Sequence, residues 1–237
     1  MADEKNIHHG HRKRMKEAML SHGIEGLNDH QVMELLLFYG VSNGDTNPIA
    51  HRLVERFGSL KGALEADYKE LLQVKGVGEN SASLIKFVQQ LSRRYLQDAY
   101  SGENEACFPD TDSLRRYYEA VFLGVRAEQV RAMLVDDELY MIKEQIILEG
   151  TVSKVELSTR KIADFVVKNN CNRLILAHNH PNGVALPSKE DILVTKELNN
   201  VLNMLDISLL DHIIVGRTGS LSMRSVNMGY GIWKTTN

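Results

Sequence analysis

The sequence contains few cysteines, and they do not form a recognisable metal or disulfide pattern. Only Cys107 and Cys171 occur among its 237 residues, and there is no Cys-x-x-Cys pair. This argues against a disulfide framework, and we expect a reducing, cytoplasmic compartment. It also argues against a zinc nucleobase deaminase, which needs His-x-Glu together with two cysteines.

Long apolar runs and an excess of one charge are missing as well. No stretch reaches the length of a membrane span, and the first residues do not resemble a signal peptide, so we expect no membrane association. The formal net charge is −3, and residues 1–100 hold 13 Lys+Arg against 13 Asp+Glu. That balance provides no strong field to attract DNA. Hydrophobic residues make up 43% and charged residues 25%, which is typical of a soluble globular protein.

The most informative motif lies between residues 178 and 191. His178 and His180 stand two positions apart, and Asp191 follows eleven positions after the second histidine. Imidazole and carboxylate groups are ligands that Zn²⁺ prefers, and three of them are one fewer than a closed structural site needs. A three-ligand set leaves a coordination position for water, which favours a catalytic metal over a structural one.

The local pattern predicts how these three side chains meet. Residues 172–177 form a short apolar stretch typical of a strand, and side chains at i and i+2 of a strand point to one face. The two histidines should therefore project together from the strand's C-terminal end. After a turn at 181–183, Ser188 fits a helix N-cap and Asp191 the third helical residue. The helix start can then bring Asp191 towards the histidines.

Simpler interpretations exist for the same residues. Asp191 could be a capping residue only, and the two histidines could be ordinary polar residues at a sheet edge. Asp211 and His212 lie on a further predicted strand and could support the ring nitrogens that face away from a metal. We interpret that pair instead as hydrogen-bonded structure within a buried strand.

The motif resembles a known signature. The pattern resembles the JAMM (MPN+) metalloprotease motif: His178-x-His180, seven residues that begin with Pro181, then Ser188, two residues and Asp191. The surrounding residues 176–183 and 209–216 are similar to the bacterial RadC, or UPF0758, family, and the resemblance extends over nearly the whole chain. It implies a mixed-sheet MPN/JAB-type domain that binds one Zn²⁺ per chain through His178, His180 and Asp191. One departure is visible at residues 159–161, Thr-Arg-Lys, where many members have Pro-Arg-Glu.

The resemblance also implies catalytic residues. A glutamate before a strand would orient or deprotonate the water, and Glu128 occupies that place, with the alternatives Glu138, Glu144 and Glu149 nearby. Glu128 could equally be a solvated carboxylate at a helix end. Ser188 matches the motif serine that stabilises the oxyanion. The implied activity is a zinc-dependent hydrolase that cleaves a peptide, isopeptide or related amide bond.

The chain as a whole reads as two domains. Residues 1–98 have helical patterns, residues 99–110 are polar and turn-rich like a linker, and residues 111–237 alternate strands and helices. The predicted fold class is therefore α/β, with an all-α N-terminal domain followed by an α/β mixed-sheet MPN/JAB-type domain. The main predicted helices cover residues 10–20, 29–39, 48–57, 112–121 and 158–168; the predicted strands cover 129–135, 139–148, 172–177 and 207–215.

The N-terminal domain contains a turn that resembles a helix-hairpin-helix. Lys75, Gly76 and Gly78 lie between two helical segments, and such a turn can present backbone amides to a phosphate, with Lys86 assisting. The alternative function is therefore a DNA-associated repair or recombination accessory protein, or a metal-dependent nuclease. The turn could equally contact protein or be purely structural.

Overall fold

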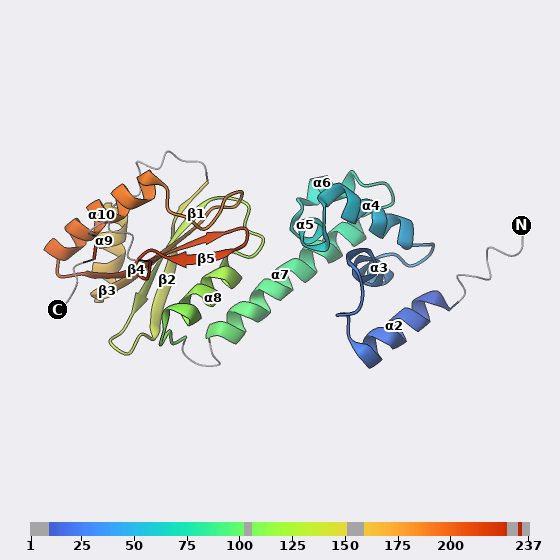
Figure 1. Ribbon diagram of the computed structural model, residues 1–237, viewed down its shortest axis with the longest axis horizontal. Helices are drawn as coiled ribbons and strands as arrows, with labels where there is room; N and C mark the ends of the chain where they lie inside the picture. Colours follow the sequence, from blue (N-terminus) through green and yellow to red (C-terminus); the bar gives the residue numbers. More distant parts are fainter. Residues whose placement is uncertain (1–9, 102–105, 151–158, 227–231, 234–237) are drawn as a thin grey trace, which may run out of the picture. The chain divides into compact units, whose positions relative to one another are not determined.

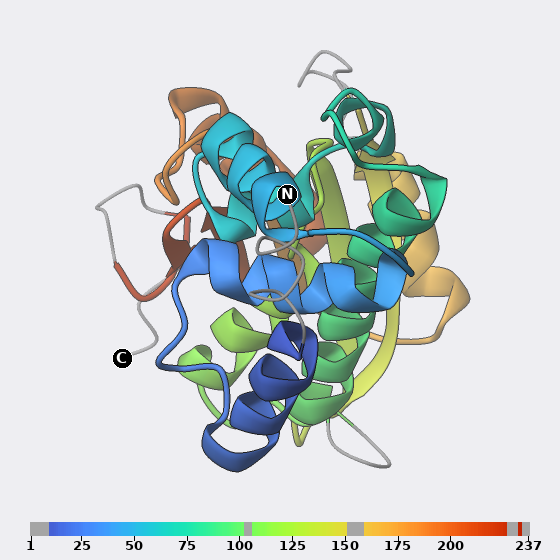
Figure 2. The same ribbon diagram turned by 90° about the vertical axis from the view of Figure 1, so that its right-hand side faces the viewer.

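The computed structural model describes residues 10–101, 106–150, 159–226 and 232–233. The chain divides into two compact units, Met1–Ser92 and Arg93–Asn237. Figures 1 and 2 draw the helices of the first unit in blue to green. These helices are α2 (His11–His22), α3 (Asp29–Gly40), α4 (Asn47–Phe57), α5 (Leu60–Glu65), α6 (Tyr68–Leu72) and the start of α7 (Glu79–Ser101).

Local signals explain where the helices of the first unit begin. Asn28 and Gln31 form a capping box at the start of α3, and Pro48 lies in the first turn of α4. The short helix α5, which the sequence pattern did not predict, begins after Ser59, whose side chain accepts a hydrogen bond from Gly62 N. Large side chains from five helices fill one apolar core, among them Met33, Leu37, Leu53, Leu71 and Ile85.

The second unit is built on a mixed five-stranded sheet. Its strands are β1 (Gln129–Val135), β2 (Met141–Glu149), β3 (Arg173–Asn179), β4 (Ser208–Gly216) and β5 (Gly219–Ser222), in the order β2-β1-β3-β4-β5. Only β3 and β4 pair in parallel, and the helix α10 (Lys189–Met204) connects them. The other pairs are antiparallel. This confirms the predicted mixed sheet.

Helices cover both faces of this sheet (Figure 1). On one face, Met133 and Ile175 share a core with Tyr118 of α8 (Thr111–Val121). On the other, Leu134 and Leu176 share a core with residues of α9 (Thr159–Lys168) and α10. The central strand β3 is buried on both faces, which explains its nearly continuous apolar sequence.

The range predicted as a linker differs from the structure where the structure describes it. The helix α7 continues through Ser101, so part of residues 99–110 is helical. Ala106 and Phe108 are buried in the core that includes α8, and Cys107 forms an isolated bridge with Tyr140. A polar, turn-rich composition marked this stretch as a linker, but two apolar side chains are enough to anchor it. The boundaries of the two predicted domains stay a prediction.

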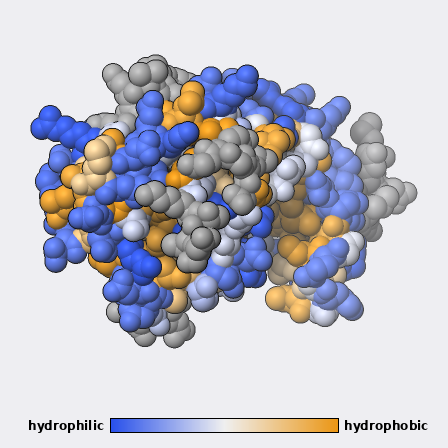
Figure 3. Space-filling model, turned by 60° about the vertical axis from the view of Figure 1, so that its left-hand side comes forward, coloured by the Kyte–Doolittle hydropathy of each residue, from blue (hydrophilic) through white to orange (hydrophobic). Residues whose placement is uncertain are grey.

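The surface mixes hydrophilic and hydrophobic side chains, as the face in Figure 3 shows. Among the described residues, none of the helices combines the length and the apolar character that crossing a membrane requires. The predicted strands and helices of the second unit are present, with boundaries that differ by a few residues. The predicted start of α9 at residue 158 lies outside the described residues.

Candidate metal centre

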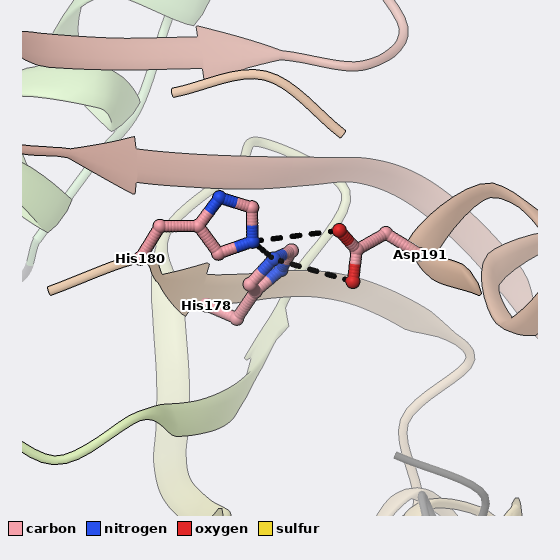
Figure 4. Close-up of side chains that lie close together, drawn as sticks. All are labelled: His178, His180 and Asp191. Atoms are coloured by element: carbon pink, nitrogen blue, oxygen red, sulfur yellow. Dashed lines mark hydrogen bonds and ion pairs between the residues drawn. The ribbon is translucent and has the colours of Figure 1, made fainter. Parts of the chain in front are cut away.

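The end of β3 presents two histidines on one face of the sheet. His178 is the penultimate residue of the strand, and His180 follows directly after it. The backbone N–H of His180 donates to the carbonyl of Val215 at 2.7 Å, which extends the pairing with β4 by one residue. The two rings therefore project together, as the spacing predicted, and both point towards Asp191 (Figure 4).

Asp191 is held by the first turn of α10. Its backbone N–H donates to Ser188 Oγ at 3.1 Å, and its Oδ2 accepts the backbone N–H of Ser188 at 2.7 Å. The Ser188 hydroxyl also donates to Oδ2, at 2.6 Å. This capping box confirms the predicted helix start, and two of its hydrogen bonds fix the carboxylate at Oδ2.

The three side chains bring their ligand atoms close together. His178 Nε2 lies 2.9 Å from His180 Nε2 and 3.6 Å from Asp191 Oδ1, and His180 Nε2 lies 3.4 Å from Asp191 Oδ2. Ligand atoms about 2.0–2.1 Å from a tetrahedral Zn²⁺ are about 3.3 Å apart. The group could therefore hold a metal ion with little rearrangement.

Hydrogen bonds around the group leave acceptor atoms at its centre. His180 Nδ1 lies 3.1 Å from the carbonyl of Val184, which can only accept, so Nδ1 carries a proton. In a neutral ring, Nε2 of His180 then has a lone pair, and it faces a carboxylate. Lone pairs that converge in this way fit a cation, so the residues present match the metal that the motif implies.

The carboxylate of Asp191 is ionised at neutral pH. Burial by itself raises the pKa of Asp191, but the neighbouring rings of His178 and His180 and the hydrogen bond from Ser188 outweigh burial and hold the pKa well below its usual range. An ionised carboxylate is the form that binds a metal ion.

A further histidine lies behind His178. His212 Nε2 is 2.8 Å from His178 Nδ1, and His212 Nδ1 is 2.7 Å from Thr195 Oγ1. Burial, first of all, lowers the pKa of His212 well below its usual value, so the ring is neutral. Our interpretation of the Asp211–His212 pair as hydrogen-bonded structure within a buried strand is incomplete for His212, because His212 also contacts the ring of His178. It holds for Asp211, which accepts hydrogen bonds from Ser222 Oγ and from the backbone of His212 and Arg224.

Both halves of the chain match models of known protein families. A family model described as RadC-like JAB domain matches residues 108–228, just over half of the chain. A second one, described as UPF0758 N-terminal, matches residues 7–83. The chain belongs to the RadC/UPF0758 family. The first match contains all three residues of the His-His-Asp group.

Within the JAB domain, Glu128 lies directly before β1. Val130 pairs with His178 in the antiparallel register, so continuing that register places Glu128 opposite His180, on the same face of the sheet. Glu128 is half-buried, and its backbone carbonyl accepts the N–H of Gly150 at 2.9 Å.

The other three candidate glutamates either contact residues on the opposite face of the sheet or lie at the far end of β1. Glu144 forms an ion pair with Arg131 at 3.0 Å, and Glu149 Oε1 accepts a hydrogen bond from Gln129 Nε2 at 2.7 Å. Arg131 and Gln129 alternate with Val130, so these contacts lie on the face opposite the histidines. Glu138 follows β1 at its far end, in the hairpin turn. Register and contacts therefore favour Glu128 among the four.

One residue near the site escaped the sequence analysis. Asn179, between the two histidines, is buried; its Oδ1 accepts the N–H of Gln129 at 2.7 Å, and its Nδ2 donates to the carbonyl of Ala127 at 3.0 Å. These bonds tie the segment that carries Glu128 to β3. The sequence could have indicated this role. In a strand, the middle residue of His-x-His points to the face opposite the histidines, and a buried asparagine amide there needs hydrogen-bond partners.

The positions predicted to contact DNA lie in the turn between α6 and α7. Lys75, Gly76 and Gly78 are exposed. Gly76 has φ +95°, and a Cβ there would lie 2.9 Å from Ile49 Cγ1, so packing alone accounts for this glycine. Lys86 Nζ donates to the carbonyl of Ala66 at 3.0 Å, after α5. The helical segments are present, but a helix-hairpin-helix is not confirmed.

Proposed function

We propose that the JAB domain is a zinc-dependent hydrolase that cleaves a peptide, isopeptide or related amide bond with metal-activated water. One observation carries the proposal: the ligand atoms of His178, His180 and Asp191 lie close together, with each histidine Nε2 within 3.6 Å of a carboxylate oxygen of Asp191. Among the described residues, the group has no fourth protein ligand. Three protein ligands are typical of catalytic zinc sites, whereas structural sites have four.

Exposure of the ligands indicates where a substrate would approach. The His178 side chain is 3% exposed and the Asp191 side chain 11%, while that of His180 is 16% exposed. The open side of the group is therefore the side of His180. The pairing of Val130 with His178, continued by two residues, supports a position for Glu128 on that side.

The ligands and their neighbours have distinct roles in this proposal. His178, His180 and Asp191 would hold the Zn²⁺, whose Lewis acidity makes water a nucleophile near neutral pH and polarises a carbonyl group. Glu128 accepts a proton from water and returns it to the leaving amine, as a general base and then a general acid. The substrate is a peptide or protein with an amide bond that reaches the His180 side.

Ser188 has two possible uses for one hydroxyl proton. Its O–H donates to Asp191 Oδ2, while its backbone N–H donates to the same oxygen. To stabilise an oxyanion, the hydroxyl must rotate away from Oδ2. The backbone N–H would keep Asp191 in place while it does so. The oxyanion role of Ser188 therefore remains compatible with the cap.

The test uses the full chain, metal analysis and a panel of fluorogenic peptide and isopeptide substrates. We expect about one zinc per chain, loss of that zinc in His178→Ala, and retention of zinc with loss of turnover in Glu128→Gln. Glu138→Gln, in the hairpin turn, is the matched control and should keep both. Zinc that stays bound after substitution of both histidines would contradict the proposed site.

DNA binding through residues 75–78 stays a separate prediction. Its signature is an affinity for duplex DNA that falls steeply with salt and that Lys75→Glu weakens without changing the zinc content. Cleavage of DNA that a chelator stops and that Glu128→Gln abolishes would replace the amide hydrolase with a nuclease.

A further inference from the structure

A continuous row of hydrogen bonds connects two residues of the His-His-Asp group from behind. His178 Nδ1 lies 2.8 Å from His212 Nε2, and His212 Nδ1 lies 2.7 Å from Thr195 Oγ1. Thr195 Oγ1 in turn donates to the backbone carbonyl of Asp191 at 2.6 Å. His212 is 4% exposed and Thr195 fully buried. We call His212 and Thr195 the relay.

The positions of the protons in this row follow from its last member. The carbonyl of Asp191 has no proton, so the single hydroxyl proton of Thr195 points to it. Thr195 Oγ1 must then accept a proton from His212 Nδ1. Neither ring nitrogen of His212 contacts a carboxylate, and a buried imidazolium without a counter-ion is costly, so the ring is neutral and its Nε2 accepts.

The protonation of His212 determines which nitrogen of His178 carries a proton. Because His212 Nε2 accepts, His178 Nδ1 must carry the proton of a neutral ring, which leaves a lone pair on His178 Nε2. That atom lies 2.9 Å from His180 Nε2, which also has a lone pair, and 3.6 Å from Asp191 Oδ1. With these tautomers, the two Nε2 atoms and the carboxylate oxygen are three acceptors that face one point, where a metal ion would bind.

We propose that His212 and Thr195 are positioning residues that hold His178 in the tautomer whose Nε2 binds the metal ion. This rests on the proposed function, because it concerns the same metal site. Histidine ligands usually donate their other N–H to a carboxylate, a backbone carbonyl or water, and the carboxylate and the carbonyl can only accept, so they fix the position of the proton. The imidazole of His212 could donate or accept at either nitrogen. The hydroxyl of Thr195 therefore determines that His212 accepts the hydrogen bond from His178.

The relay also connects three elements of the fold. His178 lies on β3, His212 on β4, and Thr195 one helical turn after Asp191 on α10. The strands β3 and β4 are parallel neighbours, and α10 is the helix that joins them. A shift of α10 would therefore disturb the ring behind His178 as well as the carboxylate in front of it.

Thr195→Val and Thr195→Ser form the matched pair that tests the relay. Valine keeps the shape of threonine and loses the hydroxyl, whereas serine keeps the hydroxyl. In the valine variant His212 Nδ1 has no acceptor, so nothing holds His212 Nε2 as an acceptor for His178. A purely structural role would lower stability in Thr195→Val without changing the protonation pattern of His178.

The first readout is the tautomer of His178 in the metal-free full chain. Imidazole ¹⁵N signals are recorded at pH 8, above the ordinary histidine pKa of about 6.5, and the signals of His178 are assigned through their loss in His178→Ala. We expect protonation at Nδ1 in the wild type and in Thr195→Ser, and a shift towards Nε2 protonation in Thr195→Val. An unchanged pattern in folded Thr195→Val would overturn the proposal.

The second readout is zinc affinity, measured by competition with a chromophoric chelator. We expect Thr195→Val to bind zinc about 10- to 100-fold more weakly, as is typical when a partner behind a ligand is lost, and Thr195→Ser to stay close to the wild type. Wild-type affinity in Thr195→Val would overturn the proposal.

A second pair of variants keeps the test decisive if Thr195→Val does not fold. The amide of His212→Gln can accept from His178 and donate to Thr195, and it has no second tautomer; His212→Leu can do neither. The proposal requires tighter zinc binding by the glutamine variant, and equal affinities would overturn it. If the variants differ in zinc affinity as expected but the wild type cleaves no substrate, the proposed hydrolase function is contradicted. The role of the relay in binding zinc would still be supported.

Discussion

The side-chain oxygen of Asn179 lies 2.7 Å from the backbone nitrogen of Gln129, the residue that follows Glu128. Asn179 stands between the two histidine ligands but points to the opposite face of β3. The end of this strand therefore places two candidate metal ligands on one face and, through Asn179, holds the segment of the candidate general base from the other.

Substitution of Asn179 should separate positioning of Glu128 from metal binding. In Asn179→Ala the N–H of the buried Gln129 loses its acceptor, which costs about 1–3 kcal/mol of folding free energy. Freed from β3, residues 127–129 should misplace Glu128, and we expect turnover to fall about 10- to 100-fold.

Zinc content of Asn179→Ala should match the wild type, since no ligand is touched. Zinc content, the free energy of unfolding in urea and turnover are measured for this variant. The control is Asn203→Ala, at an exposed position on α10, which should change none of these three quantities. Loss of zinc in Asn179→Ala, with turnover per bound zinc preserved, would refute the assignment.

Gly216 should be essential for the shape of the loop at 181–187. A Cβ at this position would lie 2.3 Å from the backbone nitrogen of Ala185 and 2.6 Å from the carbonyl carbon of Val184, so Gly216→Ala must displace the loop. The Val184 carbonyl holds His180 Nδ1, and we expect zinc affinity about 10- to 100-fold below wild type.

Zinc competition titration measures this effect. Gly26→Ala is the matched control, because no atom lies within 4 Å of a Cβ there. Wild-type affinity in Gly216→Ala would show that the Val184 contact does not orient His180.

Asp211 should give the chain a pH-dependent stability. Burial raises the pKa of Asp211 despite hydrogen bonds from Ser222, Arg224 and His212. An acid whose pKa is higher in the folded than in the unfolded chain binds its proton more tightly when folded. Its stabilising contribution is therefore present at low pH and is lost as pH rises from about 3.9 through the folded pKa.

The variant Asp211→Asn removes this titration and retains acceptors for the backbone N–H groups. We expect the free energy of unfolding of Asp211→Asn to improve relative to the wild type as pH rises from about 4 to 7. Urea unfolding of both proteins at each pH gives the difference. A constant difference across the series would mean that Asp211 does not titrate differently on folding.

The two glycines of the turn before α7 should behave differently. Gly76→Ala forces a side chain into a left-handed conformation and against Ile49, and we expect a loss of about 1–3 kcal/mol in folding free energy. Gly78→Ala meets no atom within 4 Å and should leave stability nearly unchanged, which thermal unfolding will show.

The same pair tests whether the turn touches DNA. Close approach of a phosphate to the backbone would make Gly78→Ala weaken DNA binding although its stability is normal. Equal stability losses in Gly76→Ala and Gly78→Ala would contradict the packing explanation for Gly76.

Patterns of short range allowed much of the fold to be predicted. The capping signal at Ser188 and the two-residue spacing of the histidines depend on neighbours in sequence, and the structure has both of them. Because strand alternation and helix capping fix directions as well as positions, the convergence of His178, His180 and Asp191 could be expected as well.

Contacts between distant segments were beyond this kind of inference. His212 reaches His178 only because β3 and β4 pair in one particular register, with an irregularity between Leu174 and Ile175. Ala106 and Phe108 looked like linker residues because their partners lie on α8 and the sheet. Thr195 was not predicted, although it could have been inferred, because it stands four residues after Asp191 and therefore on the same side of the helix.

The capping box of α10 has a consequence for how the proposed metal ion would bind. Ser188 fixes Asp191 by bonds that involve no cation, and Val184 and His212 orient the two rings in the same way. The ligands are thus arranged by folding itself, unlike those of domains that fold around zinc. If the site binds zinc as proposed, the ion should enter and leave a site that is already formed, so that a chelator removes the ion and leaves the helix content unchanged.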